Sequence, residues 1–597
     1  MTILQALAGH YDRLASRGDA PPYGFSNEKI SFAILLSSDG SVVDVQSLQD
    51  MSGKKPLPGI WAVPRPVKRT SGVASNFLWD KTAYALGVKV DVAPGTSVLA
   101  EREFAAFKAL HEALLADSED EGLSAFLAFL RTWQPTDYGT LRHAEDMLAA
   151  NANLVFRLDD GELQFLHDRG AARTVWANHL DKGGGSEGLC LVTGGRGPVA
   201  RLHPAVKGVR GAQSSGASIV SFNLDAFESF DKLQGANAPV SERAAFAYTT
   251  ALNVLLAPGS RQRIQIGDTT TVFWAEARDP DQSAAAEDLF SVLVAPPTDE
   301  EEAATVRNKL QAIADGRPLA EVAPEVREDT RFYVLGLAPN AARLSIRFWH
   351  AETIGTFAER IAQHWRDLQL KPTPWASSPP VWRLLYETAT QRKAENIPPM
   401  IGGALMRSIL TGTPYPRALL AAVVARVRAD KDVNGVRAAI CKAIIARNRR
   451  ILGTAGEGVP VALQENSNDT AYNLGRLFAA YAHAERSLAE RNATLRDKYA
   501  GAASATPLRV FPVLMRGYEH NRAGLAKAGG KKAGTGVRVE QAVGQIVGLL
   551  PGTGDLPVSL TLEQQARFFI GFYHQERSFF TRRDHGGEPE QLTEGEE

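Results

Sequence analysis

The chain has 597 residues, with 66 Lys and Arg against 67 Asp and Glu, so its formal net charge at pH 7 is −1. This length exceeds the roughly 250–300 residues at which a single hydrophobic core stops growing, which predicts two or three domains. Charges interrupt every long apolar stretch and the first residues lack a signal-peptide pattern. The sequence therefore excludes a membrane span and predicts a cytoplasmic protein.

Strand and helix patterns are mixed over the first 370 residues. Residues 31–36 and 42–48 predict a strand hairpin around the turn at residues 38–40. Residues 101–116 carry phenylalanines and leucines at helical spacing, and residues 151–166 predict a second hairpin. This mixture predicts an α+β domain over residues 1–370.

A further hairpin is predicted near the end of this domain, with strands on either side of Pro339 and Asn340. Alternation in its second strand places Leu344, Ile346 and Phe348 on one face. The opposite face carries Arg343, Ser345, Arg347 and Trp349. Such a basic and aromatic face leaves open an alternative function in RNA binding or RNA processing.

Residues 371–382 hold four prolines, which are incompatible with a helix interior, so we interpret this segment as a linker. Residues 383–585 are dominated by amphipathic stretches rich in alanine and leucine, separated by breaks rich in glycine and proline. Residues 586–597 are acidic and lack apolar anchors, which predicts a disordered tail. The fold class predicted is an α+β amino-terminal domain followed by an all-α helical bundle.

The sequence shows no sign of a catalytic or cofactor site. It contains no GxxxxGK[ST] phosphate loop, no HExxH helix and no GxSxG nucleophile elbow. Its two cysteines, Cys190 and Cys441, lie far apart without a CxxC partner, which excludes a disulfide framework or a cysteine-rich zinc site. We therefore expect a protein that is not an enzyme, with no metal, no cofactor and no catalytic residue.

Three stretches concentrate basic charge in this nearly neutral protein. From Gly188 to Leu224, and again from Met51 to Trp79, the chain contains no acidic residue but several lysines and arginines beside glycine, serine and threonine. From Arg417 to Arg450, nine Lys or Arg accompany only two acidic residues. Local basic charge with small polar side chains is typical of surfaces that bind phosphate groups, so we interpret these stretches as candidate nucleic-acid contacts. An ordinary proline-rich surface loop remains an alternative for residues 51–79, and a solvated helix face remains one for residues 417–450.

Long blocks of the sequence resemble one protein family in order along the chain. The quoted blocks are YGFSNEKISFAI (residues 23–34), PVKRTSGVASNFLWDKTAYALG (66–87), HPAVKGVRGAQSSGASIVSFNLDAFESFDKLQGANAPVSERAAFAYTTALN (203–253), FYVLGLAPNAARLSIRFWH (332–350) and ENIPPMIGGALMRSILTG (395–412). Together they resemble the large subunit of the type I-C CRISPR Cascade surveillance complex, over nearly the whole chain.

This resemblance implies a DNA reader for antiviral defence. Such a subunit recognises the protospacer-adjacent motif in duplex DNA, promotes R-loop formation, holds the displaced non-target strand and docks a separate helicase-nuclease. The implied partners are guide CRISPR RNA with its 5′-handle-binding subunit, the backbone repeat subunits, small subunits, target DNA and the helicase-nuclease. The amino-terminal domain would read the motif, and residues 383–585 would form a bundle resembling a small subunit. A purely bridging scaffold remains an alternative.

Within this interpretation, basic and amide side chains on loops are candidates to contact duplex DNA, because phosphate contacts position a protein and base contacts specify the sequence. The candidates are Lys68, Arg69, Thr70, Ser71, Asn76 and Lys81 in one loop, Lys207, Arg210, Gln213, Ser214 and Ser215 in another, and Lys232, Gln234 and Asn237 in the segment after it. The candidates for a non-target-strand track are Arg426, Arg428, Arg437, Lys442 and Arg449. We interpret Ser241 as a helix cap and Phe222 and Phe227 as core residues.

Overall fold

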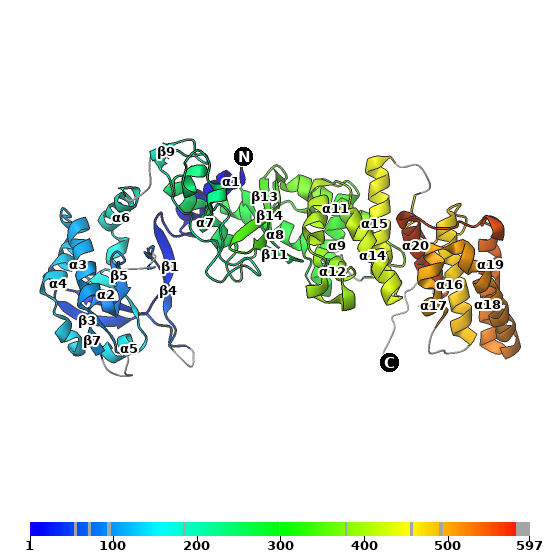
Figure 1. The fold of residues 1–597 in the computed structure, drawn as a ribbon, viewed down its shortest axis with the longest axis horizontal. Coiled ribbons are helices and arrows are strands. Elements are labelled where there is room, and N and C mark those ends of the chain that lie inside the picture. The colour runs from blue at the N-terminus through cyan, green and yellow to red at the C-terminus, as the bar shows by residue number, and fades with distance from the viewer. Residues whose placement is uncertain are drawn as a thin grey trace. The chain divides into compact units, whose positions relative to one another are not determined.

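The computed structural model describes residues 1–52, 56–67, 69, 73–91, 97–182, 187–297, 299–375, 379–453, 458–488 and 494–580. The chain divides into two compact units. Figure 1 colours the chain by residue number, from blue at the N-terminus to red at the C-terminus. The first unit comprises Met1–Gly208 and Gln213–Ala257, and the second comprises Val209–Ala212 and the chain from Pro258 onward. No helix in the described ranges is long and apolar enough to cross a membrane.

A four-stranded sheet with the order β3-β2-β8-β5 organises the first unit. Its strands are β2 (Phe32–Leu36), β3 (Val42–Ser47), β5 (Trp79–Lys81) and β8 (Asn153–Leu158). β2 pairs antiparallel with β3 and parallel with β8, and β5 pairs antiparallel with β8. Because side chains alternate along β2, Phe32, Ile34 and Leu36 enter one hydrophobic cluster, while Ala33 and Leu35 enter another.

Helices cover one face of this sheet. Phe107 of α3 and Phe126 of α4 pack around Phe156 of β8. The helices of the unit are α1 (Ile3–Arg17), α2 (Thr82–Ala85), α3 (Glu101–Leu115), α4 (Glu121–Thr132), α5 (Ala144–Ala149), α6 (Gly170–Lys182) and α7 (Glu242–Leu255). The smaller strand pairs are β1 (Phe25–Ile30) with β4 (Gly59–Pro64), β6 (Val88–Val90) with β7 (Ser97–Leu99), and β9 (Glu187–Leu189) with β10 (Arg196–Pro198).

Two sequence predictions for this unit are confirmed and one is only partly so. The hairpin of residues 31–48 and the helix of residues 101–116 are present as β2 with β3 and as α3. In the predicted hairpin of residues 151–166, β8 forms, but residues beyond its turn contribute only an isolated bridge between Arg157 and Phe165.

The second unit begins with an antiparallel sheet of order β11-β12-β13-β14. Its strands are β11 (Arg263–Ile266), β12 (Thr269–Glu276), β13 (Arg331–Asn340) and β14 (Arg343–Thr353). On one face, Phe273, Phe332 and Phe348 enter the hydrophobic core. On the other face, the rings of Trp349 and Tyr333 stack with centroids 5.4 Å apart, so these two aromatic side chains pack against each other within the sheet.

The hairpin of β13 and β14 corrects two details of the sequence prediction. Pro339 and Asn340 belong to β13, and the turn lies between Asn340 and Arg343. A β-bulge also shifts the register where Gly336 faces Phe348 and Leu337 faces Ile346. Since a bulge adds one residue to one strand, strict alternation fails: Ile346 is 41% exposed although Phe348 is buried.

Helices form the rest of the second unit, which confirms the predicted fold class. They are α8 (Pro280–Val294), α9 (Glu300–Ala314), α10 (Leu319–Val322), α11 (Ile354–Leu368), α12 (Val381–Tyr386), α13 (Ile401–Thr411), α14 (Arg417–Asp430), α15 (Gly435–Leu452), α16 (Thr470–Leu488), α17 (Leu495–Ala505), α18 (Pro507–Ala528), α19 (Gly530–Val547) and α20 (Leu562–Ser578). The domain boundary predicted at residues 371–382 stays a prediction, and the predicted tail 586–597 lies outside the described residues.

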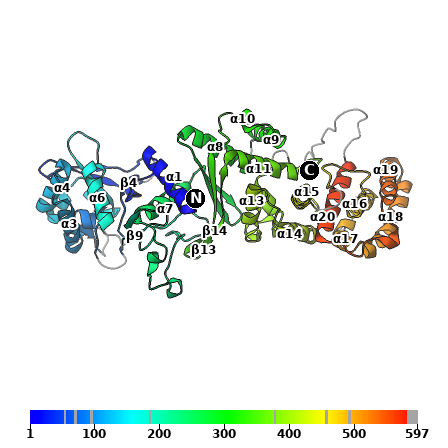
Figure 2. The ribbon, with the colours of Figure 1, turned by 90° about the horizontal axis from the view of Figure 1, so that it is seen from above.

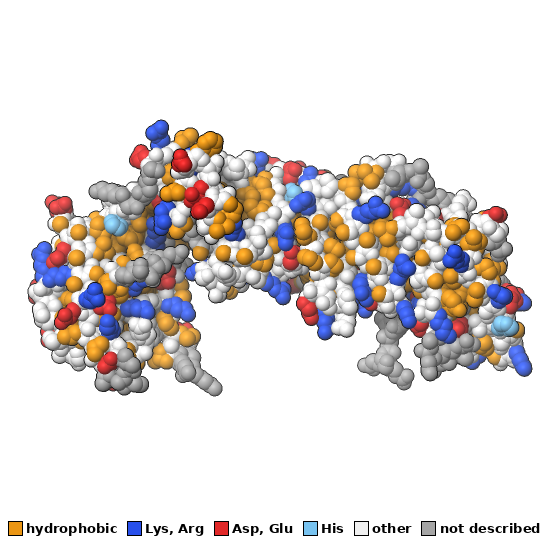
Figure 3. Space-filling view, in the orientation of Figure 1, with side chains coloured by type: hydrophobic (Ala, Val, Ile, Leu, Met, Phe, Trp, Pro, Cys, Tyr) orange, Lys and Arg blue, Asp and Glu red, His pale blue; other side chains and the backbone are white. Residues whose placement is uncertain are grey.

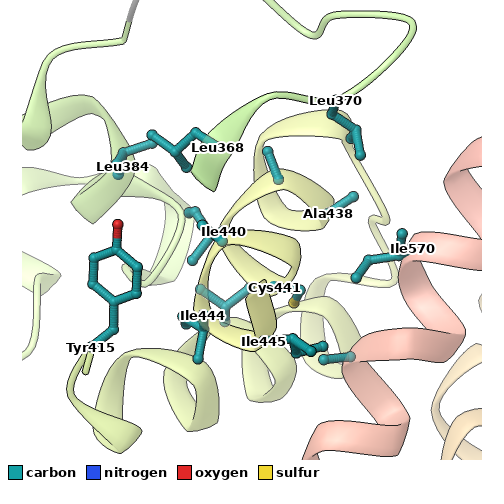
Figure 4. Packing of buried hydrophobic residues seen from close by; sticks show 14 of the residues in the cluster. Leu368, Leu370, Leu384, Tyr415, Ala438, Ile440, Cys441, Ile444, Ile445 and Ile570 are labelled. Carbon is teal, nitrogen blue, oxygen red and sulfur yellow. The ribbon is translucent and has the colours of Figure 1, made fainter. Parts of the chain in front are cut away.

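The bundle core is closely packed around α15 and around the pair α16 and α20. Figure 4 shows Ile440, Ile444 and Ile445 of α15 within the core, with Ile570 of α20 on one side and Tyr415 on the other. Glycines bring α16 and α20 together: a Cβ on Gly475 would lie 1.9 Å from the carbonyl oxygen of Phe568. No side chain fits at that distance, so the sequence selects glycine where the two backbones meet.

Candidate nucleic-acid interface

The predicted DNA-binding residues of the acid-free stretch 188–224 lie on one loop, residues 206–217. Its ends are joined by the paired main chains of Val206 and Ala217, which exchange hydrogen bonds of 2.9 and 2.8 Å. Five of the predicted DNA contacts are exposed on it: Lys207, Arg210, Gln213, Ser214 and Ser215. Lys207, Gln213, Ser214 and Ser215 are exposed in the first unit, and Arg210 is exposed in the short segment that belongs to the second unit.

Two glycines set the path of loop 206–217. Gly208 has φ of +90°, and a Cβ there would lie 2.6 Å from the carbonyl oxygen of Leu256. Gly216 has φ of +99°, with Ala205 at 2.8 Å from the same kind of added atom. Since larger residues neither adopt these φ values readily nor fit the space, the glycines fix the loop rather than loosen it.

Two residues that the sequence analysis missed hold the loop by its main chain. The side-chain oxygen of Asn253, on α7, accepts from the Lys207 amide at 2.8 Å, and its nitrogen donates to the Ala205 carbonyl at 3.1 Å. The hydroxyl of Thr270, on β12, accepts from the Arg210 amide at 3.2 Å. Asn253 stands among apolar residues in the last turn of α7, which was the available signal for it, since such a side chain usually bonds to nearby backbone.

In the acid-free stretch 51–79, two of the predicted contacts are used inside the fold. Arg69 forms an ion pair with Asp80, which is fully buried, and its guanidinium lies 4.0 Å from the ring centroid of Tyr84. Burial raises the pKa of Asp80, while the Asn76 amide, which donates at 2.9 Å, and Arg69 act in the opposite direction. Asn76 is buried, and its side-chain oxygen accepts from the Val67 amide at 3.1 Å.

A buried carboxylate needs compensating partners, and Arg69 and Asn76 supply them. Asn76 is buried, so its side chain offers little surface to DNA, whereas Arg69 is exposed beside its ion pair and its DNA contact stays a prediction. Lys81 is half-buried at the start of α2. Lys68, Thr70 and Ser71 lie outside the described residues. In the described part of this stretch, Asn76 thus has a structural role, while Arg69 combines an ion pair with an exposed position.

Asn237 likewise has a structural task. Its side-chain oxygen accepts from the Ser229 amide at 3.0 Å, and its nitrogen donates to the carbonyls of Lys232 and Gln234 at 2.7 and 3.0 Å. The Gln234 side chain accepts from Arg201 at 3.1 Å, whereas Lys232 is exposed. Asn237 is therefore a clamp within its own segment, because its amide group is occupied by main-chain partners.

The prediction for Ser241 is confirmed, and the prediction for Phe227 is wrong. The Ser241 hydroxyl accepts from the Ala244 amide at 3.3 Å at the start of α7, which confirms the predicted helix cap. Phe222 is half-buried, but Phe227 is 36% exposed, so the assignment of Phe227 to the core is wrong.

Two of the predicted strand-track residues are buried. Arg437 is only 1% exposed and pairs with Glu387 at 2.9 Å and Asp430 at 2.5 Å. The ammonium of Lys442 donates to the carbonyls of Arg366 and Asp367 at 3.3 and 3.0 Å, and burial lowers its pKa to about 8. Buried side chains with these partners support the bundle and offer no surface to a DNA strand.

The remaining three track residues differ in exposure and pairing. Arg426 pairs with Asp430 one turn along α14, Arg428 is exposed, and Arg449 is half-buried. Figure 3 shows the Lys and Arg side chains of the visible face separated by apolar and uncharged surface. A DNA contact at Arg428 and Arg449 stays a prediction.

The aromatic face considered for RNA binding is also engaged within the unit. Arg347 pairs with Asp268 at 2.9 Å, and the ring of Trp349 stacks on Tyr333. Among the described residues, no group of three or more His, Cys, Asp or Glu is placed to hold a metal ion.

The family comparison identifies the class of protein to which the chain belongs. The family model described as CRISPR-associated protein (Cas_Csd1) matches residues 7–580. The chain belongs to this family, and so to the large subunits of type I-C Cascade complexes, as its motifs predicted. The comparison with curated proteins found no match.

Proposed function

We propose that this large subunit recognises the protospacer-adjacent motif in duplex DNA, promotes R-loop formation, holds the displaced strand and docks the helicase-nuclease, without a catalytic step of its own. The observation that supports DNA recognition best is loop 206–217. It presents two cationic and three polar side chains, and its main chain is fixed by Asn253 and by two glycines with positive φ.

The chemistry of this loop suits a duplex better than a small ligand. Lysine and arginine neutralise phosphates, while a glutamine amide and serine hydroxyls can hydrogen-bond with base edges or sugar-phosphate oxygens. A loop that is already ordered pays less conformational entropy on binding. We therefore assign the positioning role to Lys207 and Arg210, and the sequence-reading role to Gln213.

The partners proposed for the assembled subunit are guide CRISPR RNA with its 5′-handle-binding subunit, the backbone repeat subunits and small subunits. Family membership supports a place in a CRISPR Cascade complex. Of the five residues predicted for the displaced strand, Arg428 and Arg449 are the ones we retain, because Arg437 and Lys442 are buried and Arg426 is paired.

The decisive experiment removes both charges of the loop in the assembled complex. Lys207→Ala with Arg210→Ala should weaken binding to motif-bearing duplex about 10- to 100-fold. It should also lower the slope of log affinity against log salt by about 1.8, since each lost phosphate contact contributes roughly 0.9.

The matched control is Arg102→Ala with Arg131→Ala, which removes the same charge from exposed positions on α3 and α4. This variant should keep both affinity and salt slope. If the loop variant and the control behaved alike, loop 206–217 would not be the DNA contact. A Gln213→Ala variant should reduce the preference for motif-bearing over motif-lacking duplex while changing the salt slope little.

A further inference from the structure

Residues 224–233 display apolar side chains to solvent. Phe230 is 91% exposed, and the segment also exposes Leu224, Phe227 and Leu233. Figure 2 shows this part of the chain projecting from the body of its unit, between β9 and α7 in colour. Single exposed apolar residues are ordinary, but four within ten residues on a projecting segment mark an interaction surface.

The segment is held in a fixed conformation at its tip. Phe230 and Asp231 have φ of +53° and +54°, and the main chains of Ser229 and Lys232 pair across them, with the Lys232 amide donating to the Ser229 carbonyl at 3.1 Å. Two successive residues with positive φ are the pattern of a type I′ turn, which glycine and asparagine favour and phenylalanine does not.

The Asn237 side chain stabilises this turn, because it hydrogen-bonds with main-chain atoms of Ser229 and Lys232. The turn thus keeps an unfavourable backbone conformation, stabilised by two side-chain hydrogen bonds, at a position where the Phe230 ring is exposed to solvent. Backbone strain that is retained at an exposed position suggests that the residue has a role in binding a partner.

Charge around the tip distinguishes between possible partners. Asp225, Glu228 and Asp231 accompany Lys232, so the segment is acidic immediately after the acid-free stretch ends at Leu224. Carboxylates beside the aromatic ring repel phosphates, which disfavours base stacking, whereas they complement a protein surface that bears lysine or arginine.

We infer that residues 224–233 form a docking knob that inserts Phe230 into an apolar pocket, rimmed by basic side chains, on another protein subunit of the complex. This inference rests on family membership and not on the proposed DNA contacts of loop 206–217. Its physical basis is that rigid aromatic anchors in desolvated pockets carry much of the affinity of protein interfaces, while surrounding charges steer association.

The test uses the full chain and the purified remainder of its Cascade complex, with association measured as a dissociation constant. Phe230→Asn suits the turn, because asparagine tolerates positive φ, but removes the aromatic ring. We expect association at least about tenfold weaker, with unchanged thermal melting of the isolated chain. Leu163→Asn is the matched control, since Leu163 is 83% exposed in the same unit and lies outside the knob; it should leave association unchanged.

A variant that removes two acidic charges changes the affinity in opposite directions for a basic protein partner and for a nucleic acid. Glu228→Gln with Asp231→Asn should weaken association with the remaining subunits several-fold and reduce its salt dependence if the pocket is rimmed by basic residues. Tighter association, or loss of binding to guide RNA or duplex DNA by Phe230→Asn with assembly intact, would show a nucleic-acid contact and overturn the inference. Equal association of Phe230→Asn and the parent chain would overturn it as well.

Discussion

Replacing Arg437 by alanine tests whether the basic charge of α15 stabilises the bundle. The guanidinium pairs with Glu387 at 2.9 Å and Asp430 at 2.5 Å, and it donates to the Asp432 carbonyl at 3.0 Å. Removing one partner of a buried ion pair costs about 3–5 kcal/mol. Because Arg392 also pairs with the buried Glu387 at 3.1 Å, we expect the lower end of that range, about 3 kcal/mol.

The effect should be measured locally, because unfolding of a chain with two units is not a single transition. Amide hydrogen exchange in α15 should be faster by roughly a hundredfold in Arg437→Ala, as about 1.4 kcal/mol corresponds to a factor of ten. Arg428→Ala, an exposed change on α14, is the control and should change the opening free energy by less than about 0.5 kcal/mol. Unchanged exchange in Arg437→Ala together with weaker DNA binding would refute the structural role and restore Arg437 to the proposed strand contact.

Two further predictions concern the cores of the units. Burial lowers the pKa of His111 to about 4, and its ring accepts from the Leu78 amide at 2.8 Å, so the neutral form is the folded one. The unfolded chain binds a proton near pH 6.5; stability from this site is therefore complete above pH 6.5 and is lost as the pH falls toward 4, by about 3 kcal/mol in all. Amide exchange in α3 should accelerate between pH 7.5 and 5 after correction for intrinsic rates, and a pH-independent opening free energy would contradict this. Gly571→Ala should destabilise the contact of α20 with α16, since its Cβ would lie 2.0 Å from the Tyr472 carbonyl oxygen. A loss of about 2 kcal/mol or more in the opening free energy of α20 is expected by amide hydrogen exchange, against little change for Gly517→Ala, where the added atom meets nothing within 4 Å.

The sequence was informative where local pattern decides structure. Helical spacing predicted α3, and glycine with basic residues located the exposed loop that contains Lys207 and Arg210. It failed where the partner is distant in the chain. Arg437 and Lys442 sit in a stretch with few acids, but Glu387 and the carbonyl of Asp367 come from outside that stretch. Local charge imbalance therefore does not imply exposed charge, because tertiary packing can supply the missing partners.

Amide side chains caused the same kind of error on a smaller scale. In sequence, Gln213 and Asn237 are equivalent candidates to read bases, but Asn237 is consumed by three main-chain partners whereas Gln213 is exposed on loop 206–217. The type of side chain determines which hydrogen bonds it can make, but only the fold determines whether those hydrogen bonds are already made within the protein.

The change of charge at Leu224 gives the two proposals a common physical basis. Up to that residue the acid-free stretch carries the loop that we assign to DNA, and immediately after it Asp225, Glu228 and Asp231 lie near the exposed Phe230 in the sequence. A uniformly basic segment would let phosphates compete for the apolar knob, and a uniformly acidic one would repel DNA from the loop. Because consecutive segments carry opposite charge, one can favour a polyanion while the next favours a basic protein surface. Charge reversal at Glu228 and Asp231 should therefore weaken assembly of the complex more than it weakens DNA binding.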